Sequence, residues 1–424
     1  MSLRKLSGDK AIEAKFGRLL SNASVSSEEI IRYATEKASE LSEGEHVLGI
    51  QDTTEINHQR HRNGVKGLGT VGNGTDVGFF LHPLLVVQAN SGACFGIGAV
   101  HYWNRMKAKD KDYQKLAIEE KESYRWLTVS EAGKQNLKSA KLLTIIADRE
   151  SDIYEEWYRI PDEKTHLLTR SCQDRQLANG KKLFEYSSEL PVAGTYGLEV
   201  RERSGKRSKH EAKLELRFGK VVIKRPRHCS DRNAPKELTL TLVDVRESAE
   251  TVIQGEEPIH WRLLTTHQVE TMEDARQVVE WYCQRWNIEQ LFRTLKQQGF
   301  DVESSQITTS EALIKLTLIA LRAATQTLQL TLARDGKLER PAQDAFLSDE
   351  IRLLEHLRPT LEGKTEKQKN PHPKATLAWA AWIIARLGGW KGYASERPPG
   401  PITMTQGQKE FASIARGWRL ARDV

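Results

Sequence analysis

Three acidic residues far apart in the chain occupy positions from which they can hold metal ions. Asp52 follows the apolar run His46–Gln51, Asp148 follows the apolar run Lys141–Ala147, and Glu289 lies in a helical pattern. Carboxylate oxygens are the ligands that Mg²⁺ and Mn²⁺ prefer. Two such ions about 4 Å apart stabilise the attacking and leaving oxygens of a phosphoryl transfer. The three acids therefore indicate metal-assisted phosphoryl transfer.

The stretch 278–298 (VVEWYCQRWNIEQLFRTLKQQ) is predicted to be one helix, because it lacks Gly and Pro and its apolar residues recur at helical spacing. At about 100° per residue, Tyr282, Arg285, Glu289 and Lys296 fall within an arc of roughly 60° at the edge of the apolar stripe. Charge at that edge is partly desolvated and needs a partner. A solvated helix face with an incidental Arg–Glu pair explains the same pattern.

The order of predicted elements brings the first two acids together. His46–Gln51, Phe79–Gln88 and Ala93–Trp103 are predicted strands, followed by a helix over 119–138, the strand Lys141–Ala147 and a helix over 149–159. Ligands in open α/β sheets collect at the carboxyl ends of strands, which is where Asp52 and Asp148 lie. Taken singly, an Asx turn explains Asp52, an N-cap explains Asp148, and a pair with Arg285 explains Glu289.

The length, cysteine content and net charge of the chain limit the kinds of protein it can be. The 424 residues are long enough for two or three domains, and no apolar run reaches the ~20 residues of a membrane span. The four cysteines are widely spaced without a CxxC pair, which indicates a reducing cytoplasm. The net charge of +7 fits a polyanionic partner.

Residues 166–266 form short alternating runs split by Gly, Pro and Ser, which predict a β-rich insertion. Within this region, residues 196–232 contain twelve Lys/Arg and five acids. That cluster is either a surface for phosphate backbones or a solvated basic hairpin. The Gly-rich loop at 64–78 has no phosphate-loop pattern and is not interpreted as a nucleotide site. Beyond residue 309 the pattern is helical, with apolar bulk that suits a core or a dimer face.

Several of these motifs together resemble a known family. The segment 148–153 (DRESDI) resembles the D-R-E-[SA]-D-[IL] box of bacterial cut-and-paste insertion-sequence transposases, and Tyr282, Arg285, Glu289 and Lys296 match their Y-(2)-R-(3)-E-(6)-K signature at every spacing. The segments 51–54 (QDTT) and 386–390 (RLGGW) also match. The resemblance, from about Ala14 to the C-terminus, is to the insertion-sequence-four type, the group that includes the transposase of the kanamycin-resistance composite transposon.

The resemblance implies an α/β fold with a ribonuclease-H-like catalytic core interrupted by a β-rich insertion, and short N-terminal and longer C-terminal helical regions. It implies two Mg²⁺ (or Mn²⁺) ions on Asp52, Asp148 and Glu289. Tyr282, Arg285 and Lys296 would contact DNA phosphates, and Trp261 would stack on a base flipped out during hairpin formation, although a strand-core role also suits a tryptophan there. The implied partners are double-stranded DNA, as transposon ends and target, and a second copy in a synaptic homodimer, in the bacterial cytoplasm in association with the nucleoid.

The implied activity is strand nicking, hairpin formation and opening, and strand transfer. Members of the family usually begin with a longer helical domain that recognises the element's end, and here the resemblance begins partway into it. A shortened, inactive regulator is therefore one alternative, and a Mg²⁺-dependent nuclease on the same core is another. The expected organisation is a partial end-binding region at 1–44, the first part of the core at 45–160, the insertion at 161–268, the last part of the core with the Glu289 helix at 269–308, and a dimerisation region at 309–424.

Overall fold

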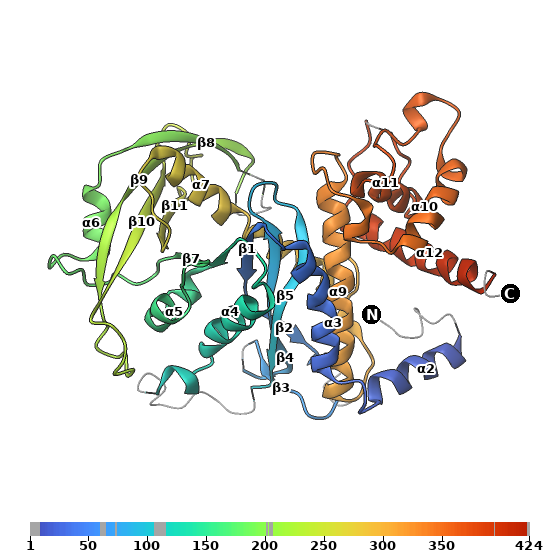
Figure 1. Ribbon diagram of the computed structural model, residues 1–424, viewed down its shortest axis with the longest axis horizontal. Helices are drawn as coiled ribbons and strands as arrows, with labels where there is room; N and C mark the ends of the chain where they lie inside the picture. Colours follow the sequence, from blue (N-terminus) through green and yellow to red (C-terminus); the bar gives the residue numbers. More distant parts are fainter. Residues whose placement is uncertain are drawn as a thin grey trace.

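The fold is built around one large mixed sheet with helices on both faces (Figure 1). The computed structural model describes residues 9–59, 65–72, 74–105, 116–200, 202, 207–393 and 395–421. Within these residues, no helix is long and apolar enough to cross a bilayer.

The sheet runs in the order β2-β4-β1-β6-β7-β11-β10-β9-β8, with β3 and β5 also paired to β4. At its centre β1, β6 and β7 are parallel, whereas β4 and β5 on one side and β11, β10, β9 and β8 on the other are antiparallel to their neighbours. The strands are β1 His46–Gln51, β2 Thr54–Asn57, β3 Gly69–Val71, β4 Asp76–Gln88, β5 Cys94–Trp103, β6 Leu142–Ala147, β7 Thr165–Arg170, β8 Gly194–Val200, β9 His210–Lys224, β10 Glu237–Glu247 and β11 His260–Thr265.

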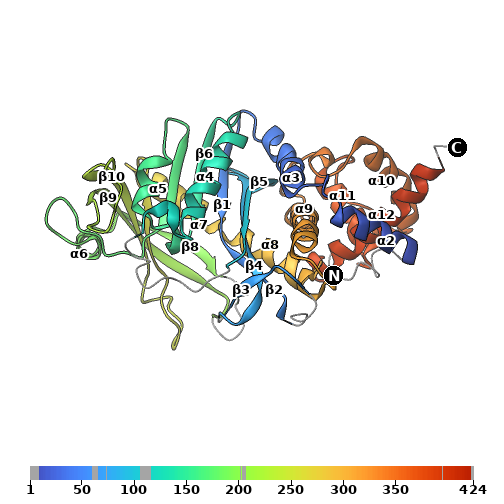
Figure 2. The ribbon, with the colours of Figure 1, turned by 90° about the horizontal axis from the view of Figure 1, so that it is seen from below.

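Successive residues of the central strands face two different cores, because side chains alternate along a strand. Val47 packs with α4 and α5 on one face, whereas Leu48 and Ile50 pack with α7, α8 and α9 on the other (Figure 2). The helices and helical turns are α2 Lys10–Ser21, α3 Ser27–Leu41, η3 Ile118–Glu120, α4 Tyr124–Asn136, η4 Arg149–Ser151, α5 Tyr154–Arg159, α6 Leu183–Glu189, α7 Met272–Cys283, α8 Trp286–Lys296, η5 Val302–Ser304, α9 Ser310–Ala333, η6 Ala342–Asp344, α10 Ser348–Leu361, η7 Glu366–Gln368, α11 Leu377–Leu387 and α12 Pro401–Leu420.

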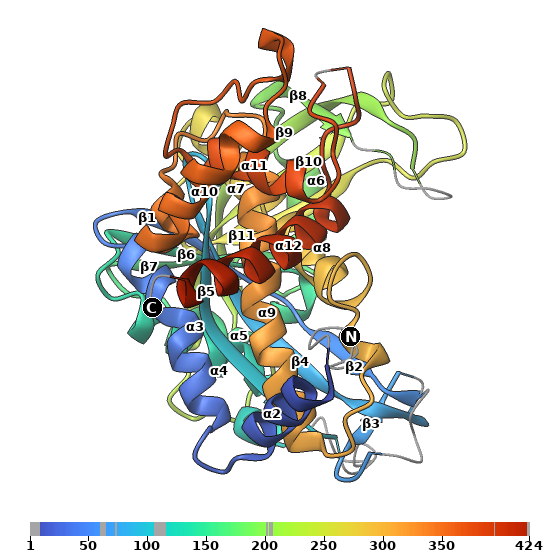
Figure 3. The same ribbon diagram turned by 90° about the vertical axis from the view of Figure 1, so that its right-hand side faces the viewer.

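The long helix α9 connects the sheet to the C-terminal helices. Its residues contribute to the core that covers β1, and it also contacts α3, α11 and α12. In Figure 3, α12 crosses α9 and α2 lies against its other end. A separate apolar core, which includes Trp379 and Trp382, holds α10, α11 and α12 together.

The region predicted as a β-rich insertion shares its sheet with the core. β7, at the start of that region, is parallel to β6, and β11, at its end, returns to pair with β7. The strands β8, β9 and β10 then extend the sheet outward (Figure 1). The sequence predicted short strands here, but it divided β9 into two runs, 213–218 and 220–224, and gave no sign of α6 or of this continuity.

Two short strands near the first acid were missed. β2 continues the register of β1 along β4, since Gln51 pairs with Leu84 and Thr54 pairs with Leu81. That register puts Asp52 opposite Pro83, which has no backbone N–H for a ladder. The strand is therefore interrupted at Asp52, and four residues are too few for period-two patterning to identify β2.

The prediction of a single helix over 278–298 is wrong. α7 ends at Cys283 and α8 begins at Trp286, and the turn between them has tight i→i−3 bonds, including Arg285 N to Tyr282 O at 3.0 Å. The reason is tertiary: α7 packs on β9 and β10, whereas α8 packs on α9. The helix predicted over 149–159 is likewise divided into η4 and α5.

The segment 386–390 (RLGGW), at the end of α11, contacts the end of α10 and the start of α12. The Arg386 guanidinium donates to the carbonyl of Leu361 and to that of Trp390 at 2.9 Å each. Gly388 lies so close to α12 that a Cβ there would be 2.1 Å from the Thr403 oxygen. This part of the motif therefore has a packing explanation.

We expect Gly388→Ala to lower the free energy of unfolding by about 1–3 kcal/mol, because backbone atoms of α12 must move to admit a methyl group. Chemical denaturation measures the change. Gly417→Ala is the matched control: it lies inside α12 with nothing within 4 Å of its Cβ. It should be neutral or stabilise by up to about 1 kcal/mol. Equal losses in both variants would contradict the packing explanation.

Candidate active site

Asp52 and Asp148 lie side by side at the carboxyl ends of neighbouring parallel strands. Ile50 on β1 pairs with Ile146 on β6, and two further residues on each strand lead to the two aspartates. Asp148 also accepts a 2.8 Å bond from the backbone N–H of Glu150 and so caps η4. The N-cap role and the strand-end position coexist, as the sequence allowed.

Arg285 connects the first and third acids. Its Nη1 lies 3.4 Å from Asp52 Oδ2, and its Nη2 lies 2.7 Å from Glu289 Oε1. All three side chains are mostly buried, with exposed fractions of 18–27%. Arg285 reaches both acids because it forms the N-terminal boundary of α8, one turn before Glu289. The break between α7 and α8, which the sequence did not predict, thus brings the Arg285 guanidinium into contact with Asp52 and Glu289.

The pKa of Asp52 reflects its crowded surroundings. Burial raises this pKa to about 7, and the Asp148 carboxylate adds to the increase. The Arg285 guanidinium and the backbone N–H of Thr53 act in the opposite direction, and Glu289 raises the pKa further. An excess of negative charge is therefore held at this edge of the sheet, which favours a bound cation.

Tyr282 and Trp261 lie next to this group. Burial raises the pKa of Tyr282, the Arg285 and Arg170 guanidinium groups lower it in part, and Asp148 raises it. The Trp261 ring lies 5.5 Å from the Tyr282 ring, centroid to centroid, and is tilted by 60°. Trp261 is partly buried on β11 at the edge of the main core, so its aromatic ring is packed but not enclosed.

Lys296 bonds to residues other than Asp52, Asp148 and Glu289. Its ammonium group donates to the carbonyl of Glu55 at 2.9 Å and pairs with Glu303 at 3.1 Å. Glu303 also accepts from the backbone N–H of Asn57, so Lys296 holds β2 and η5 against the end of α8. This role is structural as it stands.

Arg170 is a candidate that the sequence reasoning missed. It is the last residue of β7, and because Ala147 pairs with Thr169, the register carries Arg170 to the position beside Asp148. It influences the pKa of Tyr282, and its Nη2 donates to the carbonyl of His260 at 3.1 Å. Its position at the carboxyl end of a predicted strand could have indicated a site residue. The sequence analysis places that strand in the insertion and not in the core, so Arg170 is not among the predicted site residues.

The donor chemistry of the three acids fits divalent cations, since all donors are carboxylate oxygens in a region of excess negative charge. Among the described residues, however, no group of three acids, histidines or cysteines is already gathered at ligand spacing. Glu289 is engaged with Arg285. Binding of cations by all three acids therefore requires the Arg285 contacts to rearrange.

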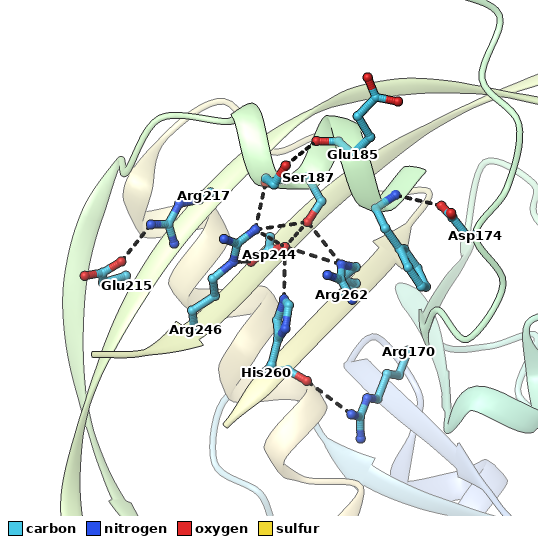
Figure 4. A network of polar contacts seen from close by, with 12 residues as sticks. Arg170, Asp174, Glu185, Ser187, Glu215, Arg217, Asp244, Arg246, His260 and Arg262 are labelled. Atoms are coloured by element: carbon cyan, nitrogen blue, oxygen red, sulfur yellow. Dashed lines mark hydrogen bonds and ion pairs between the residues drawn. The ribbon is translucent and has the colours of Figure 1, made fainter. Parts of the chain in front are cut away.

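A buried charge network supports the strand that carries Trp261 (Figure 4). On the opposite face of β10 and β11, the fully buried Asp244 accepts from Arg246 at 2.7 Å, and His260 and Arg262 lie 3.4 and 3.7 Å from it. Although burial favours the protonated acid, hydrogen bonds from His260, Arg246 and Ser187 hold the pKa of Asp244 at about 2. The network therefore fixes β10 to β11 and to α6.

The basic cluster at 196–232 is partly neutralised in the fold. Lys209 pairs with Glu199, Lys213 with Glu250 and Arg217 with Glu215. Arg201, Arg203 and Lys206 lie outside the described residues. The choice between a phosphate surface and a solvated hairpin stays open.

Comparison with known proteins gives a match to one family model. Residues 119–325 match the family model of the transposase DDE domain. The match supports a DDE transposase family. It includes Asp148 and Glu289 and begins after Asp52. A transposase function, and with it an enzyme that processes nucleic acid, is thereby supported, whereas the insertion-sequence-four type stays a prediction.

Among solved structures, the chain is similar to a piggyBac transposase synaptic complex with hairpin DNA, determined by cryo-electron microscopy. The TM-score is 0.30 at 11% sequence identity, with 70% of this chain and 53% of that chain covered. The transposase chain of that complex is thus matched over about half of its length.

We expect Asp52→Asn to raise the melting temperature of the metal-free protein more at pH 8 than at pH 5.5. Because the folded pKa is about 7, against a usual value of 3.8, the folded state binds more protons than the unfolded state between these values, and stability falls as pH rises through them. At pH 5.5 Asp52 is neutral and resembles Asn. Differential scanning calorimetry in EDTA measures this. Glu43→Gln, at the surface, should melt with the wild type at both pH values, and an Asp52→Asn effect independent of pH would contradict the assignment.

Proposed function

We propose that the protein is a DNA transposase that excises and inserts an insertion sequence of the insertion-sequence-four type. The observation that carries the proposal is the pair of aspartates aligned at the ends of β1 and β6, facing Glu289 and Arg285 from α8. The DDE domain match over residues 119–325 supports the same reaction class. Other phosphoryl-transfer enzymes share such acids, so the DNA-directed part rests on the domain match and on the neighbouring aromatic and cationic side chains.

In this proposal Asp52, Asp148 and Glu289 hold two divalent ions, which supply Lewis-acid activation of water and stabilise the leaving oxygen. The high pKa of Asp52 means that cation binding competes with a proton near neutral pH. Arg285 balances the charge of Asp52 and Glu289 in this structure. Its guanidinium would also suit a DNA phosphate, which offers it two anionic oxygens as a carboxylate does.

The DNA strand would approach along Trp261, Tyr282 and Arg170, which lie on the same side of Asp148. The partly buried Trp261 ring offers a face for a flipped base, and Arg170 offers a guanidinium for a phosphate. Lys296 would join in phosphate binding only by exchanging its Glu303 partner.

The remaining parts of the proposal concern organisation. The antiparallel strands β4 and β5 beside parallel β1 and β6 support a ribonuclease-H-like core. Residues 161–268, which include β7, are inserted into that core and extend the same sheet. The separate apolar core of the C-terminal helices suits a dimerisation region at 309–424. The synaptic homodimer, residues 1–44 as an end-binding region and the association with the nucleoid complete the proposal.

We expect Glu289→Gln to reduce cleavage of DNA that carries the flanking inverted repeats by at least about 10²–10³-fold, because a proposed carboxylate ligand of the ions that would stabilise the transition-state charge is lost. Purified full-length protein, labelled DNA and Mg²⁺ provide the assay, with EDTA as a second negative control. Glu280→Gln, on α7, is the matched control and should cleave as the wild type does.

The product pattern separates the alternatives. Nicks and hairpin ends at the repeat support the transposase. Cleavage of any DNA without hairpins would indicate a nuclease on the same core, and dimerisation without cleavage by wild type or variant would indicate a regulator.

We expect Trp261→Ala to lower hairpin formation by roughly 10–100-fold, since stacking of a base on an aromatic ring contributes about 1–3 kcal/mol. The first nick should be nearly unchanged, because it needs no flipped base. Gel analysis of nicked and hairpin products measures both steps, and Trp261→Phe should restore most of the hairpin. A parallel loss of nicking would instead assign Trp261 to the core.

A further inference from the structure

A chain of hydrogen-bonded side chains includes the two residues that flank Asp52. Arg125 Nε donates to Thr53 Oγ1 at 2.8 Å, and Thr53 Oγ1 lies 2.7 Å from His82 Nδ1. His82 Nε2 lies 3.2 Å from Gln51 Oε1, and Gln51 Nε2 donates to Glu156 Oε1 at 3.2 Å. The residues on either side of Asp52 are thus both members of one chain that runs from a guanidinium to a carboxylate.

Every hydrogen bond in this chain has the same direction. Burial holds the pKa of His82 well below its usual value, so the ring is neutral and carries one proton. The Gln51 amide oxygen can only accept, which places that proton on Nε2 and leaves Nδ1 to accept from Thr53. Donors therefore follow head to tail, an arrangement in which neighbouring bonds polarise one another.

Both ends of the chain also hold the loop that follows Asp148. At one end, Arg125 Nη2 donates to Glu150 Oε2 at 2.8 Å. At the other end, Ser151 Oγ donates to Glu156 Oε2 at 2.5 Å. Glu150 and Ser151 are the second and third residues after Asp148, so the contacts form a closed ring around the two strand ends.

Four side chains of the ring are shielded from solvent. Gln51 and His82 are fully buried, and Ser151 and Glu156 are 1% exposed. Ser130 on α4 adds a 3.2 Å bond to Glu156 and accepts from Gln51 at 3.0 Å, so the carboxylate receives three donors. Burying these polar groups costs desolvation energy that apolar side chains in the same space would not cost. We therefore relate the polar ring to the relative placement of Asp52 and Asp148 and not to stability.

We propose that this ring, with Glu156 as its terminal acceptor, is a positioning device that fixes the separation of Asp52 and Asp148 and so sets their affinity for divalent ions. Glu156 touches neither aspartate in the contacts described above and acts through Gln51 and Ser151. The inference rests on the proposed function, because it assumes that the aspartates bind cations.

Two substitutions at Glu156 separate positioning from charge. Glu156→Gln keeps an amide oxygen for Gln51 and Ser130, and its amide N–H can donate to the Ser151 hydroxyl. Glu156→Ala removes the acceptor that Gln51, Ser130 and Ser151 share, and of these donors Gln51 keeps its bond to Ser130. Binding of Mn²⁺ to the full-length protein at pH 8, followed by electron paramagnetic resonance, reports the aspartate pair without requiring DNA cleavage.

We expect Glu156→Ala to weaken Mn²⁺ binding by about 10–100-fold, as loss of residues that orient metal ligands does. Glu156→Gln should stay within about threefold of wild type if hydrogen bonding and not charge is what matters. Arg125→Gln, which opens the ring at its other end, should resemble Glu156→Ala. Ser187→Ala removes a buried partner of Asp244 in the distant network and controls for general destabilisation.

The outcomes test the metal site and the positioning role of Glu156 separately. Wild-type protein that binds no Mn²⁺, or an Asp52→Asn variant that binds as well as wild type, would overturn the proposed metal site and the inference with it. Mn²⁺ binding that depends on Asp52 but is unchanged in a folded Glu156→Ala variant would overturn the positioning role alone. So would an equal loss of affinity in Ser187→Ala at a matched melting temperature.

Discussion

Two carboxylates held next to each other in a largely buried setting are the constraint on which the rest of the structure depends. Asp52 and Asp148 repel one another and lose hydration, and the increase in the Asp52 pKa to about 7 expresses that cost. A protein keeps such a pair only if the backbone holds it in place and a positive group balances it. Here the parallel pairing of β1 and β6 provides the first, and Arg285 provides the second.

Each surrounding element can be understood from that requirement. The interruption of the strand opposite Pro83 ends the regular pairing of β1 at the first aspartate. The turn between α7 and α8 aims Arg285 at Asp52 and Glu289, while the packing of α8 on α9 fixes the direction of the helix. The ring that ends at Glu156 ties the backbone around both aspartates to α4 and α5.

The extension of the sheet has a similar logic farther from the acids. β11 pairs directly with β7. The buried Asp244 and its arginine and histidine partners hold β10 and β11 together. Trp261 is thereby held at a fixed position relative to Tyr282, as the proposed stacking of a base on its ring requires.

The sequence by itself determined the local elements and the residue types of the site. Apolar runs ending in acids identified β1 and β6, and the strand-end positions of Asp52 and Asp148 predicted that these acids lie together. The spacing of Tyr282, Arg285, Glu289 and Lys296 resembles a transposase signature, and the domain match supports a DDE transposase family. The register between β1 and β6 comes from the structure. These features are encoded within a few neighbouring residues, so pattern and propensity suffice. Only the tertiary structure decided the break before α8, the turn of Lys296 toward Glu303, the arrival of Arg170 beside Asp148, and the ring from Arg125 to Glu156. Each of those depends on contacts between segments far apart in the chain, where packing outweighs local preference.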